Sequence, residues 1–268
     1  MATFCLRATS IFSSLALRAV RTPSAAPLAK LNAASSLRAA AAPLSFCMET
    51  RAFASEAPER LANLSLVARP APDFTADAAM PGGEIAKLTL SELCGNGSGV
   101  VLLFYPLDFT FVCPSEILAF NAAVADFEKL GFKVVGVSVD SVFTHQAWMR
   151  VPLAEGGIGK LDFPLVSDLD KTISSRYHSL LNNSVALRTL VIIDGAKNVR
   201  HMTVNDLPLG RNVEEALRVC EMIREVEKNG GKQVCPANWR RGEKMMEASF
   251  HGVKDYLGGL REKIEKQI

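Results

Sequence analysis

One stretch constrains the fold of this chain more than any other. An unbroken apolar run at residues 100–105 ends at Pro106 and is followed, after a short turn, by Cys113 and Pro114. The apolar run predicts a buried strand, and a proline favours the first turn of a helix, so Cys113 is predicted to lie at a helix start. Unpaired N–H groups and the helix dipole place partial positive charge there, which favours a reactive thiolate. The alternative is a buried, inert cysteine, the commoner fate of this residue type.

Strands and helices alternate along the rest of the chain. Strands are predicted at residues 85–90, 133–139, 188–194 and 198–204, the last two forming a hairpin. Helices are predicted after Ser91 and Asn212 as capping residues, from Cys113 to Gly131, and around His145. This alternation predicts an α/β architecture with a mixed sheet.

The composition excludes several classes of function. With 49% hydrophobic residues and a formal charge of +2, the chain is typical of a soluble globular protein, and neither nucleic acid nor a membrane is expected as a partner. No stretch beyond the N-terminal segment approaches the ~20 apolar residues that span a bilayer. The loop at residues 95–99 lacks the Gly-Lys-Ser/Thr of a phosphate-binding loop, and no zinc-ligand spacing is present. We therefore expect no cofactor and no metal.

The N-terminal segment differs from the rest of the chain. It is rich in Ala, Ser and Leu, with spaced arginines and no acidic residue before Glu49. This composition is typical of an organelle transit peptide, because a secretory signal would need an uninterrupted apolar core. Residues 51–55 resemble a mitochondrial processing site cut after Phe53. Residues 1–53 are therefore predicted to be a cleaved transit peptide to the mitochondrial matrix, with a plastid as the alternative.

The strongest motif surrounds the cysteine. Pro106, Thr110 and Cys113 match the P-x-x-x-T-x-x-C active-site motif of the peroxiredoxins. The wider string FYPLDFTFVCPSEI resembles the typical two-cysteine class of that family, except that Ser115 stands where the class usually has threonine. The resemblance extends from about Leu64 to Tyr256. Its other landmarks are Asp140-Ser141, His145, Trp148, residues 164–168, Arg188, residues 205–211 and residues 234–239.

The resemblance implies a fold and a division of the chain. Residues 64–228 would form a thioredoxin-like α/β domain with the peroxiredoxin insertions. Residues 229–268 would form a C-terminal extension that carries the resolving cysteine of the family, matched here by Cys235.

The implied activity is that of a thioredoxin-dependent peroxiredoxin, an oxidoreductase that reduces hydrogen peroxide and organic hydroperoxides and serves antioxidant defence and cell redox homeostasis. Cys113 would attack the peroxide and become a sulfenic acid, and Cys235 would then form an intersubunit disulfide with it. Ionisation alone gains little: lowering a thiol pKa by two units raises the thiolate about tenfold but costs roughly eightfold in nucleophilicity. Groups that hold the peroxide must therefore supply most of the acceleration. The resemblance implies four of them: Arg188 as the cation, Thr110 as a hydrogen-bond donor, Pro106 as a shield from water, and Glu116 to orient Arg188.

The resemblance also implies partners. They are a hydroperoxide substrate, thioredoxin as reductant, a second copy of the chain, often in a decamer of five dimers, and sulfiredoxin, which repairs overoxidised cysteine with ATP. Family members that overoxidise readily carry a Gly-Gly-Leu-Gly loop and a C-terminal Tyr-Phe pair. The counterparts here are residues 156–159, Gly-Gly-Ile-Gly, and Tyr256-Leu257, so intermediate sensitivity is expected. Two alternatives use the same oligomer: a holdase chaperone and a redox relay.

Other chemically capable side chains are interpreted as packing. Cys220 lies on the apolar side of its predicted helix and Cys94 near a helix end, so both are expected to be buried. His145 and Trp148, about one helical turn apart, are interpreted as packing or interface and are not included in the site.

Overall fold

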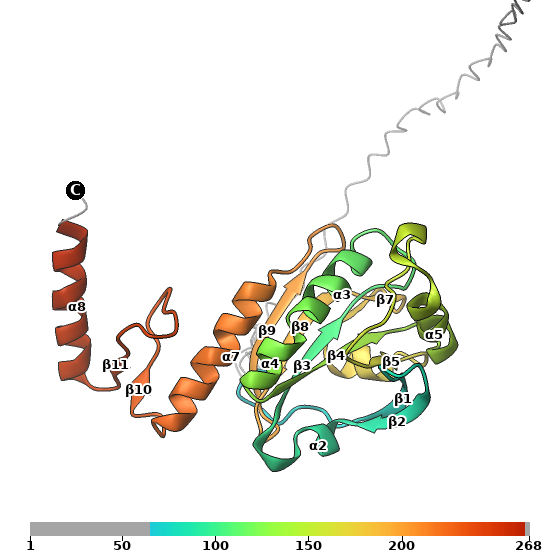
Figure 1. Ribbon diagram of the computed structural model, residues 1–268. Coiled ribbons are helices and arrows are strands. Elements are labelled where there is room, and N and C mark those ends of the chain that lie inside the picture. Colours follow the sequence, from blue (N-terminus) through green and yellow to red (C-terminus); the bar gives the residue numbers. More distant parts are fainter. Residues whose placement is uncertain (1–64, 266–268) are drawn as a thin grey trace, which may run out of the picture. The chain divides into compact units, whose positions relative to one another are not determined.

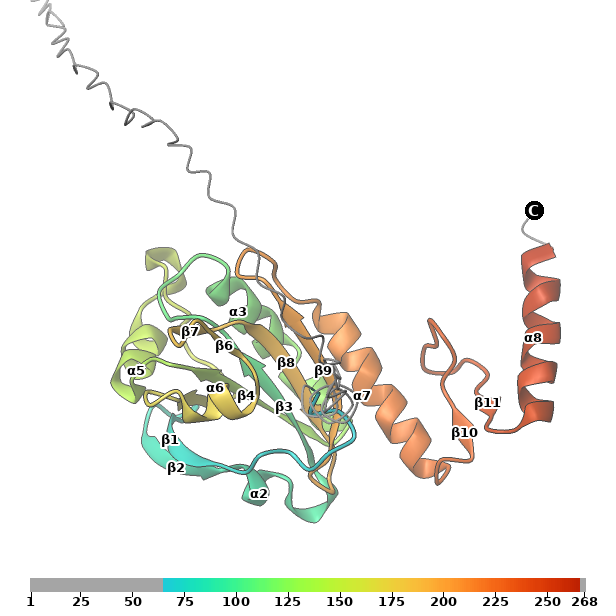
Figure 2. The same cartoon turned by 180° about the vertical axis from the view of Figure 1, so that it is seen from behind.

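The computed structural model describes residues 65–265, and the predicted transit peptide lies outside the described residues. A seven-stranded sheet with the order β2-β1-β5-β4-β3-β8-β9 forms the centre (Figures 1 and 2). Its strands are β1 (Thr75–Ala79), β2 (Ile85–Thr89), β3 (Gly99–Phe104), β4 (Phe132–Ser138), β5 (Leu165–Ser167), β8 (Arg188–Ile193) and β9 (Val199–Asn205). Strand β3 pairs in parallel with β4 and antiparallel with β8, which confirms the predicted mixed sheet.

Helices cover both faces of this sheet. On one face, α3 (Cys113–Ala122), α4 (Val124–Lys129) and α7 (Val213–Lys228) pack over a core that includes alternate residues of β3. On the other face, α2 (Leu90–Leu93) and α6 (Thr172–Arg176) pack over the remaining residues of β3. All six residues of β3 are buried, which explains why its sequence is an unbroken apolar run rather than an alternating one.

The turn after β3 delivers Cys113 to a helix start, as the sequence predicts. Helix α3 begins at Cys113, with Pro114 in its first turn. The predicted single helix to Gly131 is wrong in one respect, because Ala123 leaves the helical conformation and divides it into α3 and α4. The apolar face nevertheless continues across the break, since the rings of Phe120 and Phe127 stack 5.9 Å apart.

Two capping predictions had opposite outcomes. The side-chain oxygen of Asn212 accepts a hydrogen bond from the Glu215 amide at 3.0 Å, so the predicted cap of α7 is confirmed. Ser91 does not cap α2, because the helix begins one residue earlier and Thr89 precedes it without a side-chain cap. The amide of Ser91 instead donates to the Asp73 carboxylate at 3.1 Å, from a segment 18 residues away.

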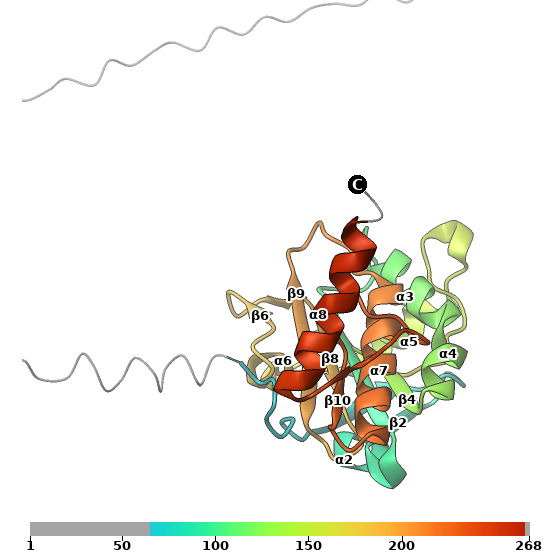
Figure 3. The same ribbon diagram turned by 90° about the vertical axis from the view of Figure 1, so that its left-hand side faces the viewer.

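The remaining elements lie around this core. Helix α5 (Val142–Arg150) contacts β1 and β5, and β6 (Leu180–Leu181) pairs with β7 (Val185–Ala186). The C-terminal extension contains the hairpin β10 (Gln233–Val234) and β11 (Met246–Glu247), followed by α8 (Phe250–Glu265) (Figure 3). Within residues 65–265, no helix combines the length and apolar character needed to cross a membrane.

Candidate active site

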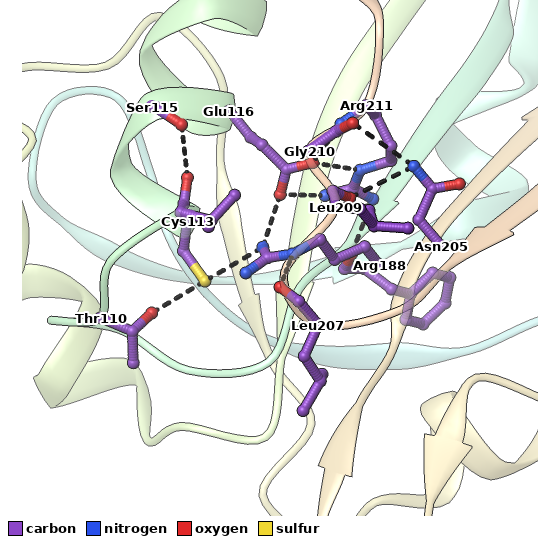
Figure 4. A network of polar contacts seen from close by, with 12 residues as sticks. Thr110, Cys113, Ser115, Glu116, Arg188, Asn205, Leu207, Leu209, Gly210 and Arg211 are labelled. Atoms are coloured by element: carbon purple, nitrogen blue, oxygen red, sulfur yellow. Dashed lines mark hydrogen bonds and ion pairs between the residues drawn. The ribbon is translucent and has the colours of Figure 1, made fainter.

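Two polar side chains lie beside the sulfur of Cys113. This sulfur is fully buried at the first position of α3, where the helix N-terminus presents its unpaired N–H groups. The hydroxyl of Thr110 lies 2.9 Å from the sulfur, and Nη1 of Arg188 lies 3.4 Å from it (Figure 4). Arg188 opens β8, 75 residues along the chain, so the sheet topology brings the cation to the thiol.

The Thr110 hydroxyl has one proton and two acceptors. It lies 2.8 Å from the carbonyl oxygen of Leu107 as well as 2.9 Å from the sulfur of Cys113. When the sulfur carries a proton, the thiol can donate to the hydroxyl oxygen while the hydroxyl donates to Leu107. When the sulfur is a thiolate, the hydroxyl can turn and donate to it. The same side chain therefore serves both charge states of Cys113.

Glu116 holds Arg188 in place. Nη1 of Arg188 donates to the Glu116 carboxylate at 2.7 Å, and Nε donates to the carbonyl of Leu207 at 2.6 Å. Both side chains of the ion pair are almost fully buried. A guanidinium fixed at two points presents Nη1 to the sulfur with little freedom to swing away.

A second arginine, Arg211, completes the network and was not identified from the sequence. It binds both carboxylate oxygens of Glu116, at 2.8 and 2.9 Å, and also donates to the carbonyls of Phe104 and Thr189. Burial pushes the pKa of Glu116 upward, but the hydrogen bonds and charge of Arg211, with the charge of Arg188, outweigh burial and hold the pKa below its usual range. Two guanidinium ions then face one carboxylate, so the four charged groups sum to zero when Cys113 is a thiolate.

Two further residues of the motif, Pro106 and Ser115, lie in the turn before α3 and in its first turn. Pro106 is buried at the start of the turn that carries Thr110. The hydroxyl of Ser115, in place of the family threonine, donates to the Val112 carbonyl at 2.6 Å.

Cys235 follows β10, and its thiol faces the Met222 carbonyl on α7 at 4.0 Å. Burial, together with the charge of Glu225, raises the pKa of this thiol against the opposing charge of Arg218. In the single chain, Cys113 and Cys235 are both free thiols.

The side chains interpreted as packing are buried, as predicted. Burial raises the pKa of Cys94 to about 11 and raises that of Cys220 further still. His145 is also fully buried, but it is hydrogen-bonded to the carboxylate of Asp108, in the turn that carries Thr110. Among residues 65–265, no cluster of three or more His, Cys, Asp or Glu side chains could hold a metal ion.

The geometry defines the chemistry that this site can perform. A buried sulfur at a helix N-terminus, with a cation and a hydroxyl beside it, can act as a nucleophile. The same two donors can stabilise negative charge on an atom that leaves as the sulfur attacks.

Comparisons with known proteins identify similar chains. The profile of the AhpC/TSA family matches residues 67–202, and that of the C-terminal domain of 1-Cys peroxiredoxin matches residues 222–259. The chain is 47% identical over 193 residues to alkyl hydroperoxide reductase C of Helicobacter pylori, covering 72% of this chain and 96% of that protein. It is 48% identical over 194 residues to the chloroplastic 2-cysteine peroxiredoxin of Chattonella marina var. antiqua, covering 72% and 98%. The structure of the mitochondrial 2-Cys peroxiredoxin from Plasmodium falciparum matches with a TM-score of 0.60 and 49% identity, covering 63% of this chain and 99% of that chain.

Proposed function

Because this chain belongs to the AhpC/TSA family of peroxiredoxins and is a thiol peroxidase with a thioredoxin-like fold, we propose that Cys113 is its peroxidatic cysteine. The single observation that carries this assignment is the pair of donors on the sulfur. Thr110 lies 2.9 Å away and Arg188 lies 3.4 Å away, and Arg188 is itself held by Glu116.

In the first step, the thiolate of Cys113 attacks one oxygen of a hydroperoxide. The S–O bond forms as the O–O bond breaks, the sulfur becomes a sulfenic acid, and the other oxygen leaves with the electron pair and takes up a proton as water or alcohol. Arg188 and Thr110 face the position where this charge develops. Donors of this kind are typically worth about 10²–10³ in rate. Pro106 and the burial of Cys113 keep bulk water from the thiolate.

In the second step, Cys235 of a second copy resolves the sulfenic acid. Its thiol condenses with the sulfenic acid of Cys113 to form a disulfide and release water, and thioredoxin then reduces the disulfide. A disulfide requires Cα atoms about 4.4–6.8 Å apart, which the buried first residue of α3 reaches only if that turn unwinds. Partial exposure of Cys235, and its contact with Met222 instead of Cys113, support resolution between two subunits. A homodimer follows from this pairing, and a decamer is the larger assembly that we propose.

The loop Gly156–Gly159 and helix α8 bear on overoxidation. Nε1 of Trp148 donates to the Gly156 carbonyl at 3.2 Å, which anchors the loop to α5. Leu257, on α8, occupies the position of the family phenylalanine and is about half exposed. We propose intermediate sensitivity to overoxidation, with sulfiredoxin as the repair partner.

Residues 1–53 are proposed to direct the protein to the mitochondrial matrix, and residues 64–228 and 229–268 to be the catalytic domain and its extension. Similarity to the mitochondrial protein of Plasmodium falciparum supports this localisation, whereas the chloroplastic relative supports the plastid alternative. Fusing residues 1–53 to a fluorescent protein tests the proposal: fluorescence in mitochondria is expected, and fluorescence in plastids or cytosol contradicts it.

Peroxide consumption coupled to thioredoxin, thioredoxin reductase and NADPH tests the two cysteines. Cys113→Ser should abolish turnover, and Cys235→Ser should allow one oxidation but no thioredoxin-linked turnover. Cys220→Ser serves as the matched control, because this thiol is buried on α7 and is not one of the proposed catalytic residues. Non-reducing electrophoresis after peroxide should show a dimer that both site variants lose. Full activity in Cys113→Ser would refute the assignment.

A further inference from the structure

The turn between β3 and α3 is fastened at Asp108 by three hydrogen bonds. One carboxylate oxygen accepts a hydrogen bond from the Tyr105 hydroxyl at 2.8 Å, and the other lies 2.7 Å from Nδ1 of His145 on α5. The Asp108 amide donates to the carboxylate of Asp140, which follows β4, at 2.9 Å. The side chains of Asp108 and His145 are completely buried. The start of the turn, the segment after β4 and helix α5 each contribute one partner to this residue.

The hydrogen-bond partners of the His145 imidazole indicate where its protons lie. Nε2 of His145 faces the carbonyl oxygen of Val166 at 3.2 Å, so this nitrogen carries a proton. One further proton lies between Nδ1 and the Asp108 carboxylate, on either side. The pair is electrically neutral in both arrangements, and both ring nitrogens have partners, so the buried network is satisfied.

Asp108 lies between Leu107, whose carbonyl contacts the Thr110 hydroxyl, and Phe109, which directly precedes Thr110. Leu107, on one side of Asp108, supplies the carbonyl 2.8 Å from that hydroxyl. Phe109, on the other side, has a positive φ of 52°, a conformation that is uncommon for a bulky residue. Its ring lies 5.9 Å from that of Trp148. Such a backbone persists only where its surroundings hold it, and the neighbouring Asp108 is held by three hydrogen bonds.

We propose that His145 is a positioning residue for peroxide reduction: acting through Asp108, it holds the turn so that the Thr110 hydroxyl points at the sulfur of Cys113. This inference rests on the proposed role of Cys113. A packing role alone does not explain a buried histidine–carboxylate pair, because well-packed apolar side chains of similar volume usually stabilise a core at least as well. A hydrogen bond from His145, unlike an apolar contact, fixes the orientation of the Asp108 side chain.

Two substitutions of His145 distinguish a positioning role from a packing role. The side-chain nitrogen of asparagine is as many bonds from Cα as Nδ1 of histidine, so His145→Asn keeps a donor toward Asp108. The side-chain nitrogen of glutamine corresponds in the same way to Nε2, so His145→Gln keeps the donor toward Val166 and loses the one toward Asp108. Both variants remove the imidazole, so a packing role predicts similar losses in both.

The measurement compares two reactions of the same sulfur in the full chain. Iodoacetamide needs only an accessible thiolate, whereas hydrogen peroxide also needs the aimed hydroxyl. We expect the ratio of the peroxide rate to the iodoacetamide rate to fall about tenfold or more in His145→Gln, because small misplacements of catalytic groups lower the reaction rate strongly. In His145→Asn, the ratio should stay within about threefold of wild type. Equal ratios in the two variants, or a wild-type ratio in His145→Gln, would overturn the proposal.

A second pair covers the case in which a histidine variant does not fold. Asp108→Asn can keep every hydrogen bond of the network without charge, whereas Asp108→Leu has similar size and keeps none of the side-chain bonds. The rate ratio should be retained in the first and fall in the second, and any other order overturns the proposal. If Cys113 were not peroxidatic, Cys113→Ser would keep the peroxide reaction, so that failure is recognised before the His145 variants are compared.

Discussion

Replacing Arg211 by methionine should destabilise the protein in a way that depends on pH. The substitution removes one of the two cations that face Glu116 and leaves a buried carboxylate with Arg188 alone. Removing one partner of a buried pair costs about 3–5 kcal/mol. Because Glu116 keeps Arg188, we expect the lower end, about 3 kcal/mol of unfolding free energy at pH 7.5.

The pH dependence follows from the direction of the pKa shift. The folded protein holds the pKa of Glu116 below its usual range, so this group stabilises the wild type above its unfolded pKa, and that contribution is lost as pH falls through the folded pKa. In Arg211→Met, only Arg188 opposes the effect of burial on Glu116, so the pKa of Glu116 is no longer held below its usual range. Acidification therefore lowers the unfolding free energy of the variant less than that of the wild type. The stability deficit should therefore be largest at neutral pH and shrink below about pH 5, near the usual glutamate range.

Urea denaturation of both proteins between about pH 7.5 and about pH 3 measures this difference, because the range then extends below the usual glutamate pKa. Arg224→Met is the matched control, because Arg224 also binds a glutamate, Glu227, and the carbonyls of Leu130 and Gly131, but lies outside the Cys113 network. Its deficit should be nearly constant over the same range, since Glu227 is partly exposed. A deficit of Arg211→Met that does not change with pH would refute the account of Glu116.

Three further substitutions test the site and its loops. Arg188→Lys keeps the charge but loses the two-point attachment to Glu116 and Leu207. The rate of peroxide reduction should therefore fall about 10²–10³-fold, while the rate of Cys113 alkylation falls much less. Equal losses of the two rates would contradict this expectation. In Gly157→Ala, the added Cβ would clash with the Val151 carbonyl, so the loop must shift and the yield of sulfinic acid, measured by mass spectrometry, should decrease. An unchanged yield would count against a role of the loop. Leu257→Phe should inactivate faster in excess peroxide, by about fivefold if packing improves by ~1 kcal/mol, and inactivation equal to wild type would rule out this role of α8.

Local features of the chain could be predicted well from sequence. The apolar run of β3, the helix start at Cys113 and the Asn212 cap depend on residues within a few positions of one another, and all three are confirmed. The α/β class follows from the same kind of pattern. The break at Ala123 was not predictable, because the apolar spacing continues across it.

Long-range contacts account for what the sequence did not reveal. Arg211 reaches Glu116 across 95 residues. Its segment, residues 205–211, matches the family resemblance, but the sequence did not indicate that Arg211 binds Glu116. The Asp73 carboxylate, from a segment 18 residues away, binds the Ser91 amide in the first turn of α2, where the Ser91 side chain was expected to cap the helix. For His145, the helical spacing with Trp148 favoured packing, which is correct for burial but does not reveal the Asp108 contact.

The depth at which Cys94 and Cys220 are placed has a consequence for the protein's working life. Burial keeps both sulfurs protonated at physiological pH, and protonated thiols exchange poorly with disulfides. Within residues 65–265, the oxidation that we propose for Cys113 and Cys235 can therefore proceed without disulfide exchange that involves Cys94 or Cys220. The burial of Cys94 and Cys220 thus limits their reaction with other cysteines. A protein that reacts with oxidants can therefore retain four cysteines in this region without forming incorrect disulfides.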